Sequence, residues 1–255
     1  MTELNFEMLP WQEEVLADPS RFKVIAAGRR TGKSHLAAVS LIYKALNSKK
    51  GKTFYVAPTQ GQARDVMWNT IFELANPIIQ RSHINNLEIT LQGGKTIYLK
   101  GADRPDTLRG VSLNHCVLDE FAFMKDDVFS NILRPALSDL KGTALFIGTP
   151  EGRNHFYDIY LGARQWADWE AFHYTSFDNP FLDKAEIEHA RATLPKFAFQ
   201  QEYMASFDAK SQGHFSPDGF DYYEKRPAGN YDVYLGIDLA GFKQQGQRRS
   251  KKRDD

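Results

Sequence analysis

The sequence KVIAAGRRTGKS, at residues 23–34, decides the fold of this chain because its residue types fit together around a phosphate group. Residues 24–26 form a short apolar run, which predicts a buried parallel strand. Gly32, Lys33 and Ser34 then begin a predicted helix. In a phosphate loop, backbone N–H groups close on the phosphates, a lysine reaches the outer two, and a hydroxyl ligates Mg²⁺. We therefore assign phosphate binding to Gly32 and Lys33, and nucleotide and metal binding to Ser34.

The loop departs from the strict pattern G-x-x-x-x-G-K-[ST] at one position. The pattern places glycine at position 27, where this chain has Ala27 followed by Gly28. The strand before the loop and the helix after it still favour a phosphate loop, in which we also expect Gly28, Arg30 and Thr31 to contact the nucleotide. The alternative is an ordinary strand–helix turn with a surface lysine.

Composition limits the class of protein. With 255 residues, the chain can bury one α/β core and a small appendage. Basic and acidic residues balance at 32 each, so any contact with DNA must be local or shared among subunits. The sequence has no run of ~20 apolar residues and no N-terminal signal pattern, so we expect a soluble, non-exported protein with no membrane partner. The single cysteine, Cys116, excludes an internal disulfide and a cysteine-based zinc site, and we expect it to pack in a strand.

Hydrophobic spacing predicts strands that alternate with helices, and hence an α/β fold with a mostly parallel central sheet flanked by helices. Two segments around Gly93 and Gly94 alternate apolar and polar residues, which predicts an antiparallel hairpin at an edge of the sheet. A small helical lid or linker subdomain follows the sheet. Predicted strands lie at 53–57, 87–91, 96–99, 115–120 and 143–147, and predicted helices at 36–46, 59–75, 183–194 and 197–207, with a short helix within 6–16.

Two acids end the predicted strand at residues 115–120 (HCVLDE). A parallel strand places these acids at the sheet edge where the phosphate loop also lies. There Asp119 would hold Mg²⁺, directly or through water, and Glu120 would orient and deprotonate the attacking water. Thr149, after the strand at 143–147, would sense the γ-phosphate or that water. The alternative is a pair of solvated acids, and the phosphate loop upstream weighs against it.

Gln12 precedes the loop within the segment FEMLPWQEEVL at residues 6–16. Its amide offers a donor and an acceptor together, which can match the paired edge of adenine, while the neighbouring Trp11 would cover the base. The alternative is a tryptophan packed in a helix beside a solvated glutamine.

Several motifs, in an order and spacing that cover about residues 9–240, resemble the large terminase subunit of tailed double-stranded DNA bacteriophages. They are PWQ, GRRTGKS, FYVAPTQGQARDVMW, LRG, VLDE, GTP, DNPFLD and QEYMASF. The resemblance implies a P-loop NTPase of the ASCE type that hydrolyses ATP with Mg²⁺ and pumps double-stranded DNA into a preformed capsid. It also implies a ring of subunits, with the small terminase subunit and the portal protein as partners. The location implied is the host-cell cytoplasm, docked on the procapsid.

The resemblance assigns roles to individual residues. Gln12 is similar to the adenine-contacting glutamine of the family. Lys33 and Ser34 are similar to its Walker A pair, and Asp119 and Glu120 to its Walker B pair, in which the glutamate is catalytic.

Two arginines are the further catalytic candidates. Arg29 is similar to the arginine inside the Walker A loop of the family, while residues 148–150 (GTP) resemble the motif that couples hydrolysis to movement. Arg109 lies in LRG, before the Walker B strand. Because a ring ATPase needs a cation delivered across the subunit boundary, our hypothesis is that Arg109 is that trans-acting finger. The alternative is a structural salt bridge to Asp103 or Asp106.

The family carries an RNase H-type nuclease domain after the ATPase, and Asp238 in LGIDLA matches its first metal-binding aspartate. The sequence stops before any further ligand, and one carboxylate cannot assemble a two-metal site, so we expect no DNA cleavage by this chain. The expected organisation is an ATPase core at 1–174, a lid and linker at 175–230, and the start of a truncated nuclease domain with a mobile tail at 231–255.

Two other classes of protein remain open from the sequence. One is a helicase-like or restriction-type ATPase that remodels nucleic acid without a capsid. The other is a nucleotide-binding scaffold without turnover, against which Glu120 argues because a binder needs no second acid. Arg64, Lys95 and Lys100 are candidate DNA contacts that we interpret as solvated surface charges.

Overall fold

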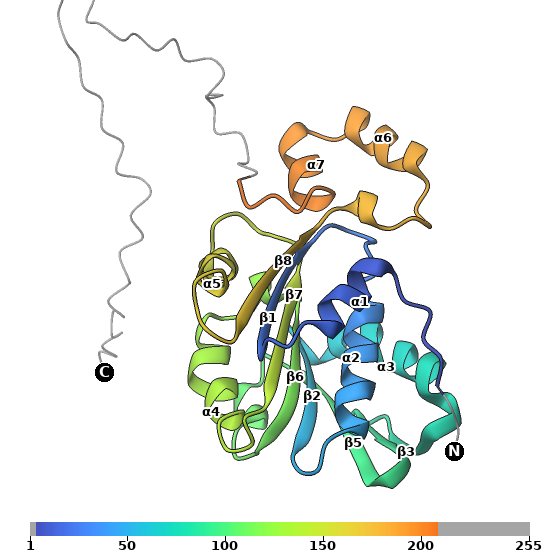
Figure 1. The fold of residues 1–255 in the computed structure, drawn as a ribbon, viewed down its shortest axis with the longest axis vertical. Helices are drawn as coiled ribbons and strands as arrows, with labels where there is room; N and C mark the ends of the chain where they lie inside the picture. Colours follow the sequence, from blue (N-terminus) through green and yellow to red (C-terminus); the bar gives the residue numbers. More distant parts are fainter. Residues whose placement is uncertain (1–3, 209–255) are drawn as a thin grey trace, which may run out of the picture. The chain divides into compact units, whose positions relative to one another are not determined.

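The computed structural model describes residues 4–208 of the chain. They form an eight-stranded sheet in the order β3-β4-β5-β2-β6-β7-β1-β8, with helices on both faces (Figure 1). The strands are β1 (Phe22–Ala27), β2 (Lys52–Ala57), β3 (Ile79–His83), β4 (Glu88–Leu91), β5 (Lys95–Gly101), β6 (Leu113–Asp119), β7 (Thr143–Gly148) and β8 (Trp169–Tyr174). The α-helices are α1 (Pro10–Ala17), α2 (Lys33–Leu46), α3 (Gln60–Ala75), α4 (Arg134–Ala136), α5 (His155–Ala163), α6 (Lys184–Thr193) and α7 (Lys196–Glu202).

The central strands are parallel and buried on both faces. β5, β2, β6, β7, β1 and β8 pair in parallel, whereas β4 runs antiparallel to β3 and β5. In β1, Ile25 belongs to the same buried cluster as Leu36 of α2, whereas Val24 belongs to the opposite cluster with Phe156 of α5. Because successive strand side chains point to opposite faces, a strand covered on both sides has no polar alternation. The predicted α/β class with a mostly parallel sheet is confirmed.

The predicted hairpin is confirmed as β4 and β5, which meet at the pair Leu91 and Lys95 across Gly93 and Gly94. β3 adds a third antiparallel strand that the sequence did not predict. Four of its five residues are exposed, so it lacks the apolar alternation by which a half-buried strand is recognised. The edge strand β8 and the helix α5 were also not predicted.

Helices α6 and α7 follow β8 and have a small core of their own, formed by Ile187, Ala190 and Phe199. The helix predicted at 197–207 ends earlier, at Glu202. The chain then turns at Ala205, whose φ is 52°, and Phe207 packs on the aromatic face of α5. The end of the predicted lid and linker at 175–230 and the predicted nuclease segment at 231–255, with Asp238, lie outside the described residues, and the domain boundaries stay predictions. Within residues 4–208, no helix combines the length and apolarity that crossing a bilayer requires.

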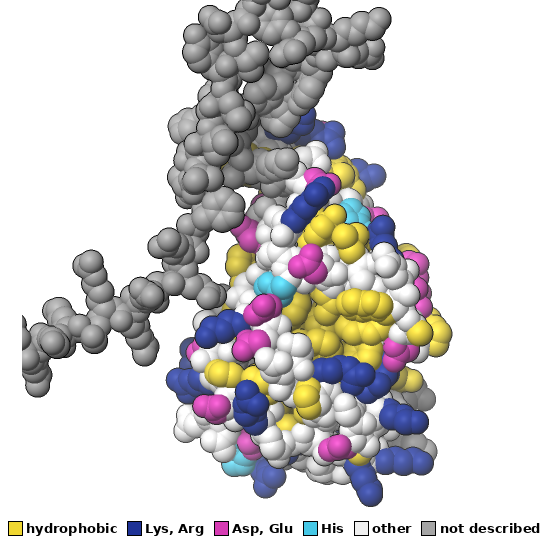
Figure 2. All heavy atoms as spheres, turned by 90° about the vertical axis from the view of Figure 1, so that its left-hand side faces the viewer, with side chains coloured by type: hydrophobic (Ala, Val, Ile, Leu, Met, Phe, Trp, Pro, Cys, Tyr) yellow, Lys and Arg dark blue, Asp and Glu magenta, His cyan; other side chains and the backbone are white. Residues whose placement is uncertain are grey.

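The face that carries α4 and α5 gathers hydrophobic side chains between charged ones (Figure 2). A pocket of about 500 Å³ there is lined in part by Phe121, Phe129, Trp166 and Trp169. Phe121 also packs edge-on against Phe146 of β7, with the ring centroids 5.0 Å apart. This aromatic wall anchors the end of β6, where the predicted acid pair lies.

Candidate active site

The loop between β1 and α2 has the backbone that its sequence predicts. Gly32 has a φ of 102°, and a Cβ at this position would meet the Nε2 of Gln12 at 2.7 Å. Arg30, with a φ of 57°, is also in the left-handed region. Glycine therefore serves both the turn and the close approach of α1 to the loop.

The loop offers unpaired backbone donors at the N-terminus of α2. Among the described residues, the backbone N–H groups of residues 30–34 have no hydrogen-bond acceptor, whereas those of Gly28 and Arg29 donate to carbonyl groups of Tyr174 and Glu202. Unpaired N–H groups at a helix N-terminus are the groups that bind phosphate oxygens. The loop is therefore shaped for a phosphorylated ligand.

Lys33 lies at the centre of the site. Its Nζ donates to the carbonyl oxygens of Ala27 at 3.1 Å and Gly28 at 2.8 Å, and to the Oγ1 of Thr149 at 3.1 Å. Burial lowers the pKa of the Lys33 ammonium, although the charges of Glu120 and Asp119 act in the opposite direction. Thr149 thus joins the loop to the end of β7, and its role in sensing the nucleotide stays a prediction.

The two acids lie at the end of β6, two strands away from β1. Asp119 is 5% exposed, and its carboxylate accepts hydrogen bonds from the hydroxyl of Tyr55 at 2.5 Å and the backbone N–H of Glu120 at 3.0 Å. Burial raises the pKa of the Asp119 carboxyl, while the hydrogen bond from Tyr55 lowers it. The alternative of two solvated acids does not fit this burial.

Glu120 begins the turn after β6 with a φ of 50°, a left-handed conformation that is uncommon for glutamate. Its Oε2 lies 3.4 Å from the backbone N of Thr149. Burial raises the pKa of the Glu120 carboxyl, and the charge of Asp119 raises it further. A carboxylate with a raised pKa is a better proton acceptor, which suits a general base.

The oxygen atoms near the loop suit Mg²⁺. Within residues 4–208, no cluster of three or more His, Cys, Asp or Glu side chains is placed to hold a metal. Mg²⁺ needs no such cluster, because it usually binds one or two protein oxygens together with phosphates and waters. Ser34, in the first turn of α2, and Asp119 supply oxygens of that type.

Gln12 is 2% exposed, and both polar atoms of its side-chain amide form hydrogen bonds within the chain. Its Oε1 accepts from the backbone N–H of Leu9, and its Nε2 donates to the carbonyl of Gly32, both at 2.9 Å. The alternative of a solvated glutamine is therefore wrong, and the contact with adenine stays a prediction. Trp11 is buried and packs on Tyr174 at a centroid distance of 4.6 Å, as a structural tryptophan would.

The segment after β8 forms hydrogen bonds and an ion pair with the phosphate loop. The backbone N–H of Arg29 donates to the carbonyl of Glu202, and the Arg29 guanidinium forms an ion pair with the Glu202 carboxylate. Ser176 Oγ donates to the carbonyl of Arg29, and Asn179 Nδ2 to that of Arg30, both at 2.7 Å. The Arg29 side chain therefore contacts α7 in this structure, and its catalytic role stays a prediction.

Arg109 lies in the connection that leads from the end of β5 to the start of β6. A groove of about 430 Å³ beside it is lined by residues 109–112, 131–132, 135–136 and 139. Its Nε is 3.9 Å from the Oδ1 of Asp106, and these side chains are 57% and 99% exposed. Such an exposed ion pair contributes little to stability, so the salt bridge to Asp106 exists but is weak. Asp103 instead accepts a hydrogen bond from the backbone N–H of Gln60 at 3.2 Å.

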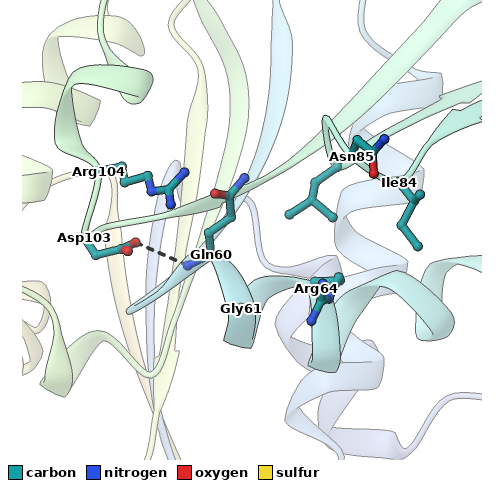
Figure 3. A pocket seen from close by; sticks show the side chains of 8 residues that line it. Gln60, Gly61, Arg64, Ile84, Asn85, Asp103 and Arg104 are labelled. Carbon is teal, nitrogen blue, oxygen red and sulfur yellow. Dashed lines mark hydrogen bonds between the residues drawn. The ribbon is translucent and has the colours of Figure 1, made fainter.

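A polar groove of about 450 Å³ lies where α3, the β3–β4 turn and the loop after β5 meet (Figure 3). It contains Arg64, whose Nε is 3.1 Å from Asp65. Lys95 donates to the carbonyl of Ser48, and the Lys100 ammonium lies over the rings of Phe54 and Tyr98. Both lysines are half-buried with partners within the chain, so neither is the solvated surface charge that we expected.

Four polar contacts of the site were not predicted. Tyr55 lies in FYVAPT and Asn179 in DNPFLD, so both stood within the recognised motifs without an assigned role. Glu202 likewise stood in QEYMASF without an assigned role, whereas Ser176 belongs to none of these motifs. Their contacts depend on strand order and on the path of the chain after β8, which spacing does not encode.

A phosphate loop that joins a parallel strand to a helix, with an acid pair on the same sheet, defines a P-loop NTPase. A family model described as terminase large subunit, T4likevirus-type, N-terminal, matches residues 24–220. The chain therefore belongs to the large terminase subunit family and corresponds to its N-terminal part.

Individual relatives agree with this assignment. The chain is 34% identical over 200 residues to the large terminase subunit of Escherichia phage T5, covering 75% of this chain and 45% of the relative. It is 30% identical over 229 residues to that of Thermus virus P23-45, covering 76% and 47%. It thus spans about half the length of the curated relatives it matches. The large terminase ATPase domain of Thermus phage P74-26 superimposes with a TM-score of 0.69 at 28% identity, covering 80% of this chain and 95% of that one.

Proposed function

We propose that this chain hydrolyses ATP with Mg²⁺ and is the motor domain of a large terminase subunit, translocating double-stranded DNA into a procapsid. The observation that carries the proposal is the acid pair of buried Asp119 and half-buried Glu120, with the Glu120 carboxylate joined to Lys33 through Thr149. Family membership supports it, as does the likeness to a domain named as an ATPase. The helicase-like or restriction-type alternative is not favoured, because the matching family is that of terminases.

Each residue of the site has a role in this proposal. The N–H groups of residues 30–34 bind phosphate oxygens, and Lys33 exchanges its carbonyl partners for the outer phosphates. Ser34 and Asp119 would hold Mg²⁺, which would neutralise charge on the phosphates. Glu120 accepts the proton of the attacking water, and Thr149 relates the state of the nucleotide to β7. Arg29 adds positive charge when phosphate replaces Glu202 as its partner.

The partners belong to the whole motor and are proposals at the same level. They are double-stranded DNA, the small terminase subunit, the portal protein and further copies of this chain in a ring. The place of action would be the host-cell cytoplasm, on the procapsid. The absence of nuclease activity stays a prediction, since Asp238 lies outside the described residues.

Steady-state ATP hydrolysis tests the proposal with the variants Lys33→Ala and Glu120→Gln. We expect each variant to lose roughly 100-fold or more of the turnover, since each removes a group that acts on the transition state. Glu120→Gln should still bind a fluorescent ATP analogue, whereas Lys33→Ala should bind it weakly.

Lys49→Ala, which removes an exposed lysine beyond α2, is the matched control and should keep full turnover. Turnover that survives in both site variants would contradict the proposal, because hydrolysis would then come from elsewhere.

A further inference from the structure

Tyr55 is a polar side chain buried in the middle of the sheet. It lies in β2, is 0% exposed, and packs among the apolar residues between the sheet and α2 and α3. β2 neighbours β6, with Tyr55 paired to Val117, two residues before Asp119. The Tyr55 hydroxyl therefore extends along β6 to its end, where it donates to the Oδ2 of Asp119 at 2.5 Å.

The Asp119 carboxylate is held at both oxygens. Oδ2 accepts from Tyr55, and Oδ1 accepts from the backbone N–H of Glu120 at 3.0 Å. A carboxylate has about four lone-pair directions, so roughly two remain for a metal ion or its water. Because the Tyr55 ring is fixed by packing on all sides, its hydroxyl sets the rotation of the carboxylate.

We propose that Tyr55 is a positioning residue for the magnesium site, orienting the Asp119 carboxylate toward the metal that Ser34 would also ligate. The inference rests on the proposed function and adds to it a residue that lies outside the phosphate loop and the acid pair. Hydrogen-bond partners of metal ligands typically change metal affinity about 10- to 100-fold when they are removed. The loss in Tyr55→Phe should lie in that range, because the ring and its packing remain.

Metal binding can be measured without turnover, by following Mn²⁺ with electron paramagnetic resonance in the presence of ADP. We expect Tyr55→Phe to raise the Kd for Mn²⁺ roughly 10-fold or more. Binding of ADP in the presence of EDTA should match the wild type, since the phosphate loop is intact. Tyr160→Phe is the matched control, because it removes another largely buried tyrosine hydroxyl, one that accepts from Arg164 Nη2 at 2.6 Å on α5.

Equal Mn²⁺ affinity in Tyr55→Phe, Tyr160→Phe and the wild type would overturn the proposal and leave the proposed function standing. A wild type that binds ADP with no dependence on Mn²⁺ would contradict both.

If Tyr55→Phe fails to fold, 3-fluorotyrosine at position 55 keeps the hydroxyl and serves instead. Its ¹⁹F resonance should move when Mg²⁺ is added to the ADP complex, and the same label at position 160 should not respond. A label at position 55 that does not respond would overturn the proposal.

Discussion

His115 is a buried histidine that the site does not use. It lies in β6, with Nε2 at 3.0 Å from Ser40 Oγ and Nδ1 at 2.7 Å from Thr143 Oγ1. Burial lowers the pKa of His115 to about 3, because the charged imidazolium would lose its hydration. The two hydroxyl groups tie α2, β6 and β7 together behind the site while the ring is neutral.

The buried histidine predicts that stability falls as pH is lowered. The unfolded chain protonates this histidine near pH 6.5, whereas the folded chain resists until about pH 3, so the unfolded state binds more protons between these values. The free energy of unfolding should therefore drop by about 2 kcal/mol from this group between pH 7 and pH 5. Urea denaturation at the two pH values measures the drop.

His115→Asn should flatten this dependence, whatever its own cost in stability. His83→Asn, which replaces an exposed histidine of β3, should keep the wild-type dependence. The same loss of stability in wild type and His115→Asn would show that His115 does not cause it.

The core of the site was predictable at the level of residues, because Lys33, Asp119 and Glu120 stand in short patterns tied to a strand or helix end. Thr149 was placed by the same reasoning and does join the loop. Tyr55 was not predictable, since its contact requires β2 to lie beside β6. Gln12 was expected at adenine but bonds to Gly32 of the loop, a contact 20 residues along the chain that no spacing rule contains.

Among the elements, the segment at 175–208, which is the described part of the predicted lid, packs directly on the phosphate loop at Gly28. A Cβ at this position would collide with the carbonyl oxygen of Tyr203 and would meet the backbone N of Ser176 at 3.0 Å. Because both neighbours are backbone atoms, neither can move without shifting the lid or the loop. The structure thus explains why glycine stands at position 28, where the strict pattern has a free position.

Gly28→Ala should lower the free energy of unfolding by about 1–3 kcal/mol, through overpacking between the loop and the lid. Gly61→Ala is the matched control, because a Cβ in α3 would have only Thr59 Oγ1 near it, at 4.0 Å. That change should stabilise the protein by about 0.4–1 kcal/mol, since alanine restricts the unfolded chain. Urea denaturation compares the two, and a Gly28→Ala protein as stable as the wild type would contradict the packing argument.

Strands that are buried on both faces, or that alternate apolar and polar residues, were predictable from the sequence. Strands at the edges of the sheet were not. The buried strand at 143–147 and the hairpin around Gly93 had clear patterns. β8 lies at the edge of the sheet and is mostly half-buried, with Trp169 and Phe172 among polar residues, so its sequence resembles neither a core strand nor a surface one.

For the whole molecule, the position of Arg109 predicts a site completed between subunits. Its connection runs from the end of β5, at the edge of the sheet that carries the phosphate loop, to the start of β6 at the opposite edge. Our hypothesis is that Arg109 there serves the loop of a neighbouring subunit. Mixing Arg109→Ala with Glu120→Ala subunits should then restore turnover that neither has alone. In a 1:1 mixture about a quarter of the sites would combine an intact Glu120 with an intact neighbouring Arg109.

Arg104→Ala is the matched control for this experiment, as it removes an exposed arginine from the same connection. It should keep turnover without mixing. A mixture no more active than the sum of its parts would remove Arg109 from the reaction between subunits.

The place of β7 in the sheet also affects how the protein folds during synthesis on the ribosome. β7 lies between β6 and β1, although it is made after both, and Lys33 and Thr149 are 116 residues apart. Until residue 148 has emerged, the facing edges of β1 and β6 lack their shared partner, and open strand edges invite aggregation. The nascent chain is therefore most prone to aggregation just before β7 is synthesised. It would first bind a nucleotide when β7 has paired with both β1 and β6.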